Sequence, residues 1–131
     1  MNIGQVAKNS GISAKMIRYY EDIGVLPASK RSDAGYRMYS EDDLKTLHFI
    51  RHARELGFST EQMKELLELW KNHDRQSAEV KDLTQKHILA LKQKIVDLQT
   101  MVDHLEQSVH CCAGNQQSEC EILNKIEFGM N

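Results

Sequence analysis

Long hydrophobic runs are missing from this sequence of 131 residues. Its apolar stretches are only a few residues long, whereas a membrane-spanning helix needs about 20 such residues. The first residues, 1–7, also lack the charged and then apolar pattern of a secretory signal peptide. We therefore expect a cytoplasmic protein with no membrane segment.

Proline and cysteine are scarce. Pro27 is the single proline, and the three cysteines, Cys111, Cys112 and Cys120, all lie near the C-terminus. Clustered thiols in a reducing compartment bind metals or carry out redox chemistry more often than they form structural disulfides. No Cys-x-x-Cys pair lies on a βαβ pattern, so the sequence predicts neither a thiol oxidoreductase nor any other enzyme.

The charge that is present is unevenly distributed. Residues 1–54 hold nine Lys/Arg and six Asp/Glu, whereas residues 55–131 hold eight Lys/Arg and thirteen Asp/Glu, for a net charge of −2. A basic front and an acidic rear suit a chain that places only its front on a polyanion. Charge alone also allows the asymmetry to be accidental.

Capping residues and glycines divide the first part of the chain into short helices. Helices are predicted at residues 3–9 and 14–23, from residue 40 to a stop at Gly57, and from residue 59 to a break at residues 72–74. The stretch between residues 27 and 40 is too irregular for a helix. It contains the turn Asp33-Ala34-Gly35 between basic and aromatic residues, which predicts a small β-hairpin, or wing.

A long uninterrupted helix is predicted over about residues 77–109, roughly 50 Å in length. Its apolar residues recur at alternating steps of three and four, which is the a/d pattern of a coiled coil. This seam consists of Ile88, Leu91, Ile95, Leu98, Val102, Leu105 and Val109. The small head in front can cover only one end of the seam, so a homodimer is expected. The residue types are typical of parallel coils, but they do not set the orientation. A polar loop, residues 110–120, follows. After it a short helix is expected at residues 121–128, with Ile122, Leu123 and Ile126 as its packing face.

The first two helices are joined by residues 9–12 and match a helix-turn-helix in size and turn chemistry. Lys and Arg reach phosphates and guanine edges, and Tyr hydroxyls position on phosphates. Adjacent helical residues diverge by about 100°, so Tyr19 and Tyr20 cannot both face DNA, and one of them is expected to be packed. The candidate DNA contacts are Lys15, Arg18 and Tyr20 on the second helix, Lys30, Arg31, Tyr36 and Arg37 on the wing, and Arg54 on the third helix.

These patterns resemble the MerR family of bacterial regulators. The resemblance is carried by residues 3–27, by RSDAGYRMY at residues 31–39, and by LKTLHFIRHARELGFS at residues 44–59. It continues through residues 75–81 and the cysteine loop, and it is strongest to the copper efflux regulators. It implies a mostly α fold, with a winged helix-turn-helix head (residues 1–72), a long antiparallel dimerisation coiled-coil helix (73–110), and a metal-binding loop with a short helix (111–131).

The family also implies a function. Its members activate transcription by binding promoter DNA as homodimers. The metal-bound form bends and untwists an overlong promoter spacer, so that RNA polymerase can engage both promoter elements.

Cys112 and Cys120 are the candidate metal ligands. Soft thiolates favour Cu(I), Zn or Fe–S centres, but a four-thiolate cluster needs a fourth cysteine that the chain lacks. Structural zinc also prefers four ligands, which here would come from three cysteines and His110. Two thiolates suffice for a linear monovalent ion, and Cys120 directly precedes a short helix whose N-terminus favours an anion.

The family resemblance bears on the metal. In its divalent-ion sensors the position of Ser77 is a cysteine, so Ser77 implies selectivity for Cu(I), with Ag(I) and Au(I) as mimics. The Cys111-Cys112 pair departs from the copper pattern and resembles the zinc sensors, so Cys111 is a candidate third ligand, a bystander or a transfer thiol. Alternatives are a regulator of the same fold that senses Zn, Cd or Pb, or a thiol-redox sensor. A copper chaperone or glutathione is the expected metal donor.

Overall fold

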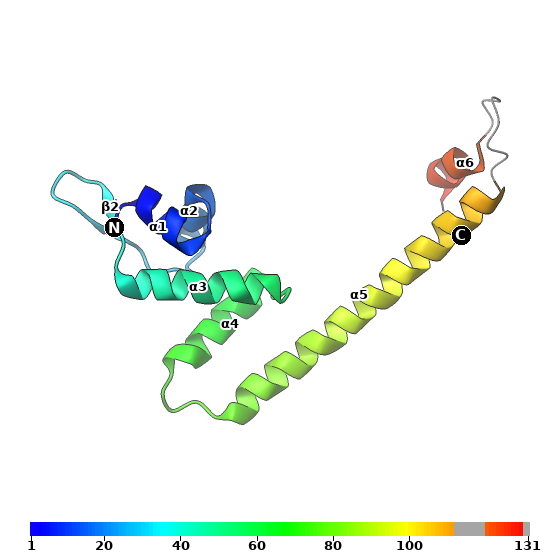
Figure 1. Cartoon of the computed structure of the whole chain (residues 1–131). Coiled ribbons are helices and arrows are strands. Elements are labelled where there is room, and N and C mark those ends of the chain that lie inside the picture. The colour runs from blue at the N-terminus through cyan, green and yellow to red at the C-terminus, as the bar shows by residue number, and fades with distance from the viewer. Residues whose placement is uncertain (112–119, 130–131) are drawn as a thin grey trace. The chain divides into compact units, whose positions relative to one another are not determined.

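The computed structural model describes residues 1–111 and 120–129. These residues form a mostly helical fold with a small two-stranded sheet (Figure 1). The chain divides into two compact units, residues 1–84 and 85–131. No helix among the described residues is long and apolar enough to cross a membrane. The predicted mostly α architecture is confirmed, whereas the predicted domain boundaries stay predictions.

Four short helices build the head, and side-chain caps set where they begin. They are α1 (Ile3–Ser10), α2 (Ala14–Asp22), α3 (Glu41–Glu55) and α4 (Thr60–Lys71). Asn2, Ser40 and Ser59 each accept a hydrogen bond from the third residue of the helix, whose side chain accepts one in return. These reciprocal caps satisfy backbone N–H groups that have no partner within the helix. The predicted starts are therefore confirmed.

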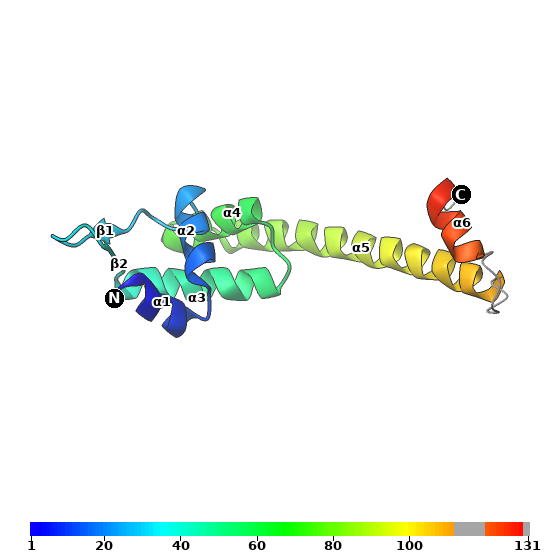
Figure 2. The same ribbon diagram turned by 90° about the horizontal axis from the view of Figure 1, so that it is seen from above.

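The predicted wing is confirmed as a hairpin of two short strands, β1 (Lys30–Arg31) and β2 (Arg37–Met38). The strands are antiparallel, with Lys30 opposite Met38 and Arg31 opposite Arg37. Gly35 has a φ of 88°, a left-handed conformation that glycine adopts without steric cost. In both views the hairpin projects away from the helices of the head (Figures 1 and 2).

The core of the head is formed by side chains that recur at helical spacing. Val6 from α1, Ile17 from α2 and Ile50 from α3 are each 0% exposed. Phe49 and Trp70 stack beside this core with their ring centroids 4.5 Å apart, which joins α3 to α4. The buried hydrophobic residues of this core are Val6, Ile12, Ile17, Tyr20, Val25, Leu26, Tyr39, Leu47, Ile50, Ala53, Met63 and Leu67.

The long helix α5 (Ser77–Cys111) has 35 residues and ends two residues later than predicted. His110 and Cys111 were expected in the loop but belong to the last turn of the helix. The rest of the predicted loop before Cys120, residues 112–119, lies outside the described residues. The short helix α6 (Glu121–Phe128) forms as predicted and lies beside the C-terminal end of α5 (Figure 2).

The apolar face of α6 is mostly exposed in the single chain. Ile122, Leu123 and Ile126 were expected to form the packing face of this helix, and Leu123 is 63% and Ile126 is 67% exposed. Ile122 is half-buried. An eight-residue helix has one narrow apolar stripe, and within this single chain that stripe is left mostly uncovered.

Candidate DNA-binding surface and cysteine region

Helix α2 presents a basic face to solvent because its other face is in the core. Ile17 and Tyr20 are three residues apart and both are buried. Lys15 and Arg18 are also three apart, and both are exposed on the other side of the helix. Ser13 starts the helix by accepting a hydrogen bond of 3.2 Å from the backbone N–H of Met16. The sequence-predicted pair of basic residues is therefore free to reach a ligand.

Tyr20 was predicted to contact DNA, but the structure places it in the core. Its side chain is only 1% exposed, whereas Tyr19 is 45% exposed. The Tyr20 hydroxyl accepts a hydrogen bond of 3.4 Å from Nη1 of Arg54. One tyrosine of the pair is packed, as expected, but it is Tyr20 and not Tyr19. The three-residue spacing from Ile17 was the sequence signal that could have identified Tyr20 as buried.

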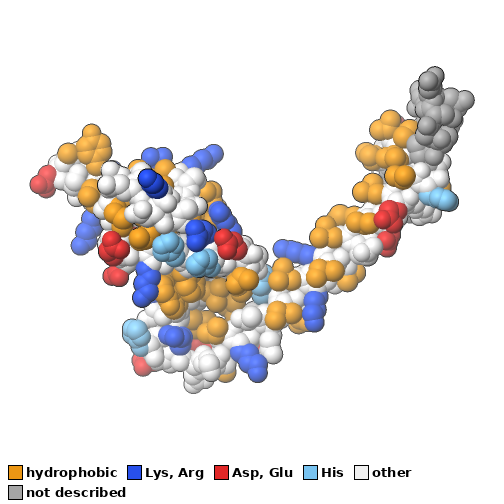
Figure 3. Space-filling view, in the orientation of Figure 1, with side chains coloured by type: hydrophobic (Ala, Val, Ile, Leu, Met, Phe, Trp, Pro, Cys, Tyr) orange, Lys and Arg blue, Asp and Glu red, His pale blue; other side chains and the backbone are white. Residues whose placement is uncertain are grey.

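The wing carries the other predicted contacts. Lys30, Arg31 and Tyr36 are exposed, and Tyr36 is 71% exposed at the hairpin tip. Nη1 of Arg31 donates a hydrogen bond of 3.0 Å to the carbonyl of Gly35, which holds its guanidinium across the hairpin. Arg37 is half-buried, and its Nη1 has no hydrogen-bond partner among the described residues. Lys and Arg side chains project from the head around the helices and the wing (Figure 3).

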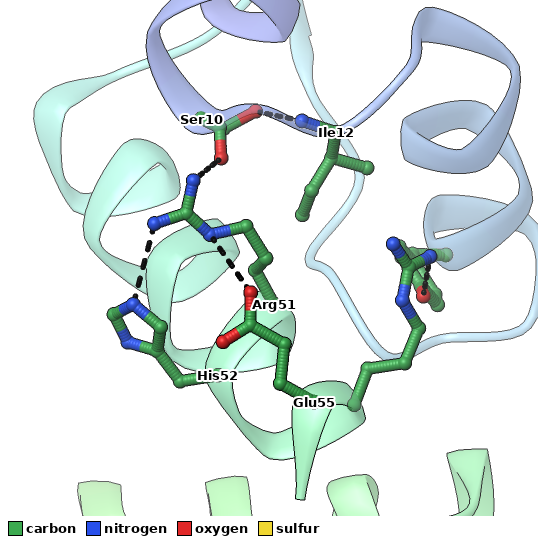
Figure 4. Close-up of polar contacts among 7 residues, drawn as sticks. Ser10, Ile12, Arg51, His52 and Glu55 are labelled. Carbon is green, nitrogen blue, oxygen red and sulfur yellow. Dashed lines mark hydrogen bonds and ion pairs between the residues drawn. The ribbon is translucent and has the colours of Figure 1, made fainter. Parts of the chain in front are cut away.

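Arg51 of α3 holds the turn between α1 and α2, a role that sequence reasoning missed. Its Nη1 donates a hydrogen bond of 3.2 Å to the carbonyl of Ser10, at the end of α1 (Figure 4). Its Nη2 lies 3.3 Å from Nε2 of His52, and its Nε lies 4.0 Å from Oε1 of Glu55. A cation near a helix C-terminus also interacts favourably with the helix dipole. No local pattern marks this contact, because Ser10 and Arg51 are 41 residues apart.

Gly11 in the same turn provides a test of this packing. Its φ is 74°, and a Cβ added there would lie 2.6 Å from Nη1 of Arg51. We expect Gly11→Ala to lower the free energy of unfolding by about 1–2 kcal/mol, because the left-handed conformation is costly for alanine. Urea denaturation followed by circular dichroism measures the change.

Gly4 is the matched control for this substitution. It lies inside α1 with a negative φ, and an added Cβ would lie 3.4 Å from Oδ1 of Asn2. Gly4→Ala is expected to stabilise the protein by up to about 1 kcal/mol, because alanine favours helix. A Gly11→Ala protein as stable as the Gly4→Ala protein would contradict the strain argument.

The cysteine residues lie at the C-terminal end of the chain. Cys111 is exposed on the last turn of α5, and Cys120 is a half-buried residue at the start of α6. Cys112 lies outside the described residues. Residues 1–111 and 120–129 hold no group of three or more potential metal ligands. Ser77 is the first residue of α5, so about 50 Å of helix separates it from Cys111 of the same chain.

Known proteins match this chain along most of its length. Residues 1–70 match the family described as MerR HTH family regulatory protein, and residues 44–108 match the one described as MerR, DNA binding. A probable heavy metal-dependent transcriptional regulator of Haemophilus influenzae is 49% identical over 96% of this chain and 98% of its own length. The HTH-type transcriptional regulator CueR of Escherichia coli O6:H1 is 36% identical over 96% of this chain and 93% of its own length.

Solved structures show the same fold. The crystal structure of PbrR691 from Ralstonia metallidurans in complex with lead(II) has a TM-score of 0.81 and 30% identity, covering 96% of this chain and 98% of that one. HiNmlR bound to promoter DNA has a TM-score of 0.58 and 26% identity, covering 84% and 83%. The fold and the relatives define a helix-turn-helix transcription regulator, not an enzyme. The chain belongs to the MerR family.

Proposed function

We propose that this protein is a metal-responsive transcriptional activator that binds promoter DNA as a homodimer and senses Cu(I) through Cys112 and Cys120. The observation that carries the DNA-binding part is the exposed basic face of α2 beside an exposed basic wing. Such a helix reads base edges in the major groove, and basic residues beside it bind phosphates.

The proposed DNA contacts follow the predicted set with one replacement. Tyr19 takes the place of Tyr20, because a buried hydroxyl cannot reach a phosphate while an exposed one can. Arg54 is exposed although it also reaches the Tyr20 hydroxyl, so it stays in the set. The proposed contacts are Lys15, Arg18, Tyr19, Lys30, Arg31, Tyr36, Arg37 and Arg54.

Dimerisation is supported by the exposure of the seam on α5. Six of its seven residues are exposed, from 43% at Ile88 to 65% at Ile95, and Leu91 is half-buried. Hydrophobic side chains follow one another along the helix (Figure 3). A contiguous apolar stripe of this kind marks an interface. In an antiparallel pair, Ser77 of one copy comes close to the cysteine loop of the other. Within one copy the length of α5 keeps Ser77 away from the cysteines.

Cu(I) is the proposed signal because Ser77, and not a cysteine, is the first residue of α5. At this position the second copy supplies a serine hydroxyl instead of a third thiolate ligand. Two sulfur ligands are enough for a soft monovalent ion. The similarity to CueR over nearly the whole chain supports this choice. The similarity to the lead(II) complex of PbrR691 and the presence of Cys111 favour the alternative, a divalent ion with higher coordination. The metal donor, a copper chaperone or glutathione, stays a prediction.

The proposed switch acts through DNA distortion. Bending a DNA site costs of order 1–6 kcal/mol, and a ligand shifts a two-state equilibrium only by the difference in its affinity for the two states. In this proposal the thiolates at the C-terminal end of each copy bind the metal more tightly in one of the two states. The heads of that state distort the promoter, and RNA polymerase then initiates transcription. Silver(I) and gold(I) share the preference for two sulfur ligands and act as mimics.

X-ray absorption spectroscopy on the Cu(I)-loaded protein tests the metal assignment. We expect two sulfur ligands per Cu(I), both in the wild type and in Cys111→Ser, with one ion per subunit. Anaerobic titration with Cu(I), Zn(II) and Pb(II), followed by transcription from the cognate promoter, is expected to give activation by Cu(I) alone. Three or four ligands, or activation by a divalent ion, would support the divalent alternative. A response to peroxide without any metal response would support a thiol-redox sensor.

A further inference from the structure

One carboxylate of α2 holds both ends of the wing. Glu21 lies near the end of α2, beyond the proposed DNA-reading residues Lys15 and Arg18. Its Oε2 accepts a hydrogen bond of 3.2 Å from Oγ of Ser29, the residue before β1. Its Oε1 accepts a hydrogen bond from the hydroxyl of Tyr39, the residue after β2. The wing is therefore clamped at its entry and at its exit by the same side chain.

Tyr39 adds a third element to this joint. Its backbone N–H donates a hydrogen bond of 2.7 Å to the carbonyl of Met1, and its carbonyl accepts one of 2.9 Å from the nitrogen of Met1. The chain enters α1 two residues later, so the start of α1, the end of α2 and the exit of the wing meet at one residue. Tyr39 is 3% exposed, and little water can compete for its hydrogen bonds.

The chemistry of the pair keeps the hydroxyl in its donating form. Burial raises the pKa of Tyr39 above its ordinary value of 10.0, because a phenolate would lose its hydration. The hydrogen bond to Glu21 and the negative charge of that carboxylate raise the pKa further. Tyr39 thus stays protonated, and keeps donating to Glu21, at neutral and mildly alkaline pH.

The wing needs such an anchor because it has little support of its own. Each strand has two residues, and an isolated two-stranded hairpin is at best marginally stable in water. The proposed phosphate contacts Arg31, Tyr36 and Arg37 all lie between the two clamped stems. These residues can bind phosphates only when the hairpin is correctly positioned relative to α2, because a phosphate contact is lost when its side chain is displaced by a few ångströms.

We propose that Glu21 is a positioning residue for DNA binding, which sets the wing relative to the recognition helix through Ser29 and Tyr39. This inference rests on the proposed DNA-binding function. Charge alone predicts the opposite effect, because a carboxylate beside a DNA-binding surface repels phosphates and its removal would strengthen binding. Loss of affinity on removal of Glu21 would therefore show that the clamp outweighs the repulsion.

The test measures DNA affinity as a function of salt for the full chain. The probe is a duplex selected from a randomised double-stranded library by the wild-type protein. Glu21→Ala is expected to weaken binding about tenfold, comparable to the loss of one hydrogen bond to a charged group. The slope of log K against log salt is expected to become shallower by about 0.9 for each wing phosphate contact that is lost.

Two variants separate the clamp from charge. Asp22→Ala removes the same charge from the neighbouring exposed residue and is expected to leave affinity unchanged or slightly higher. Glu21→Gln keeps an acceptor for Tyr39 and a donor for Ser29 without the charge, and it is expected to restore most of the affinity and the slope. A loss in Asp22→Ala equal to that in Glu21→Ala would overturn the proposal.

A double substitution separates positioning from general stability. If Glu21 acts through the wing, Glu21→Ala is expected to have a smaller effect on affinity in an Arg37→Ala background, because one of the contacts that it positions is already gone. Full additivity, or a wild-type slope in Glu21→Ala, would overturn the proposal. If Glu21→Ala does not fold, Tyr39→Phe, which removes only the hydroxyl that donates to Glu21, replaces it in the same measurements with the same expected results. A wild-type protein that selects no duplex would instead overturn the DNA-binding function itself.

Discussion

Leu98→Glu in the middle of α5 is expected to convert the protein to a monomer and to weaken operator binding by about 10²- to 10⁴-fold. Leu98 is a seam residue with 59% of its side chain exposed in the single chain. A carboxylate there would be buried against the apolar face of the second copy without a partner, which costs several kcal/mol. Each head would then bind its half-site alone and lose the contribution of the other.

Sedimentation equilibrium and a DNA titration measure the two effects on the same samples. Gln107→Glu is the matched control, because it places the same charge on α5 at an exposed residue on the opposite side of the helix from Leu105. The control is expected to remain dimeric and to bind DNA like the wild type. A dimeric Leu98→Glu protein with wild-type affinity would show that the seam is not the dimer interface.

Cys120→Ser is expected to abolish the metal-dependent activation of transcription while leaving DNA binding intact. Substitution of a residue that only supports a metal ligand lowers metal affinity about 10- to 100-fold, and loss of one of two ligands is expected to lower it more. A serine hydroxyl is harder than a thiolate and is a poor ligand for a soft monovalent ion. Cys120 lies at the start of α6, far along the chain from the head, so the DNA contacts stay in place.

In vitro transcription with added Cu(I), together with a DNA titration without metal, checks this result. Cys111→Ser is the matched control, because it makes the same change on the exposed last turn of α5. For a two-sulfur site the control is expected to keep its response. Metal-dependent activation that survives in Cys120→Ser would exclude this residue as a ligand.

Much of the fold could be predicted because its signals are local. The caps Asn2, Ser40 and Ser59 and the stop at Gly57 act within one helical turn, so their positions along the chain suffice. The wing was predictable from a turn between basic and aromatic residues, and the seam from its alternating steps of three and four. The end of α5 was placed two residues too early, because helical propensity carries on after the apolar pattern stops.

The site was predicted less completely. Lys15, Arg18 and the wing residues Lys30, Arg31 and Tyr36 are exposed, because polar side chains stay in water wherever the backbone allows, whereas Arg37 is half-buried. Tyr20 was assigned to the wrong side of α2, since an aromatic residue with a hydroxyl suits either a core or a DNA surface. The spacing from Ile17 would have decided between the two sides, had it been weighted above the chemistry of the side chain.

The sequence by itself determined which elements exist, where they begin, and which family the chain belongs to. Each of these depends on neighbours in the chain or on the types of residue present. Only the tertiary structure decided what Arg51 and Glu21 do. Arg51 reaches Ser10 across 41 positions, and Glu21 reaches Tyr39 across 18. Such contacts arise from packing between separate elements, and no periodicity in the sequence records which side chains that packing brings together.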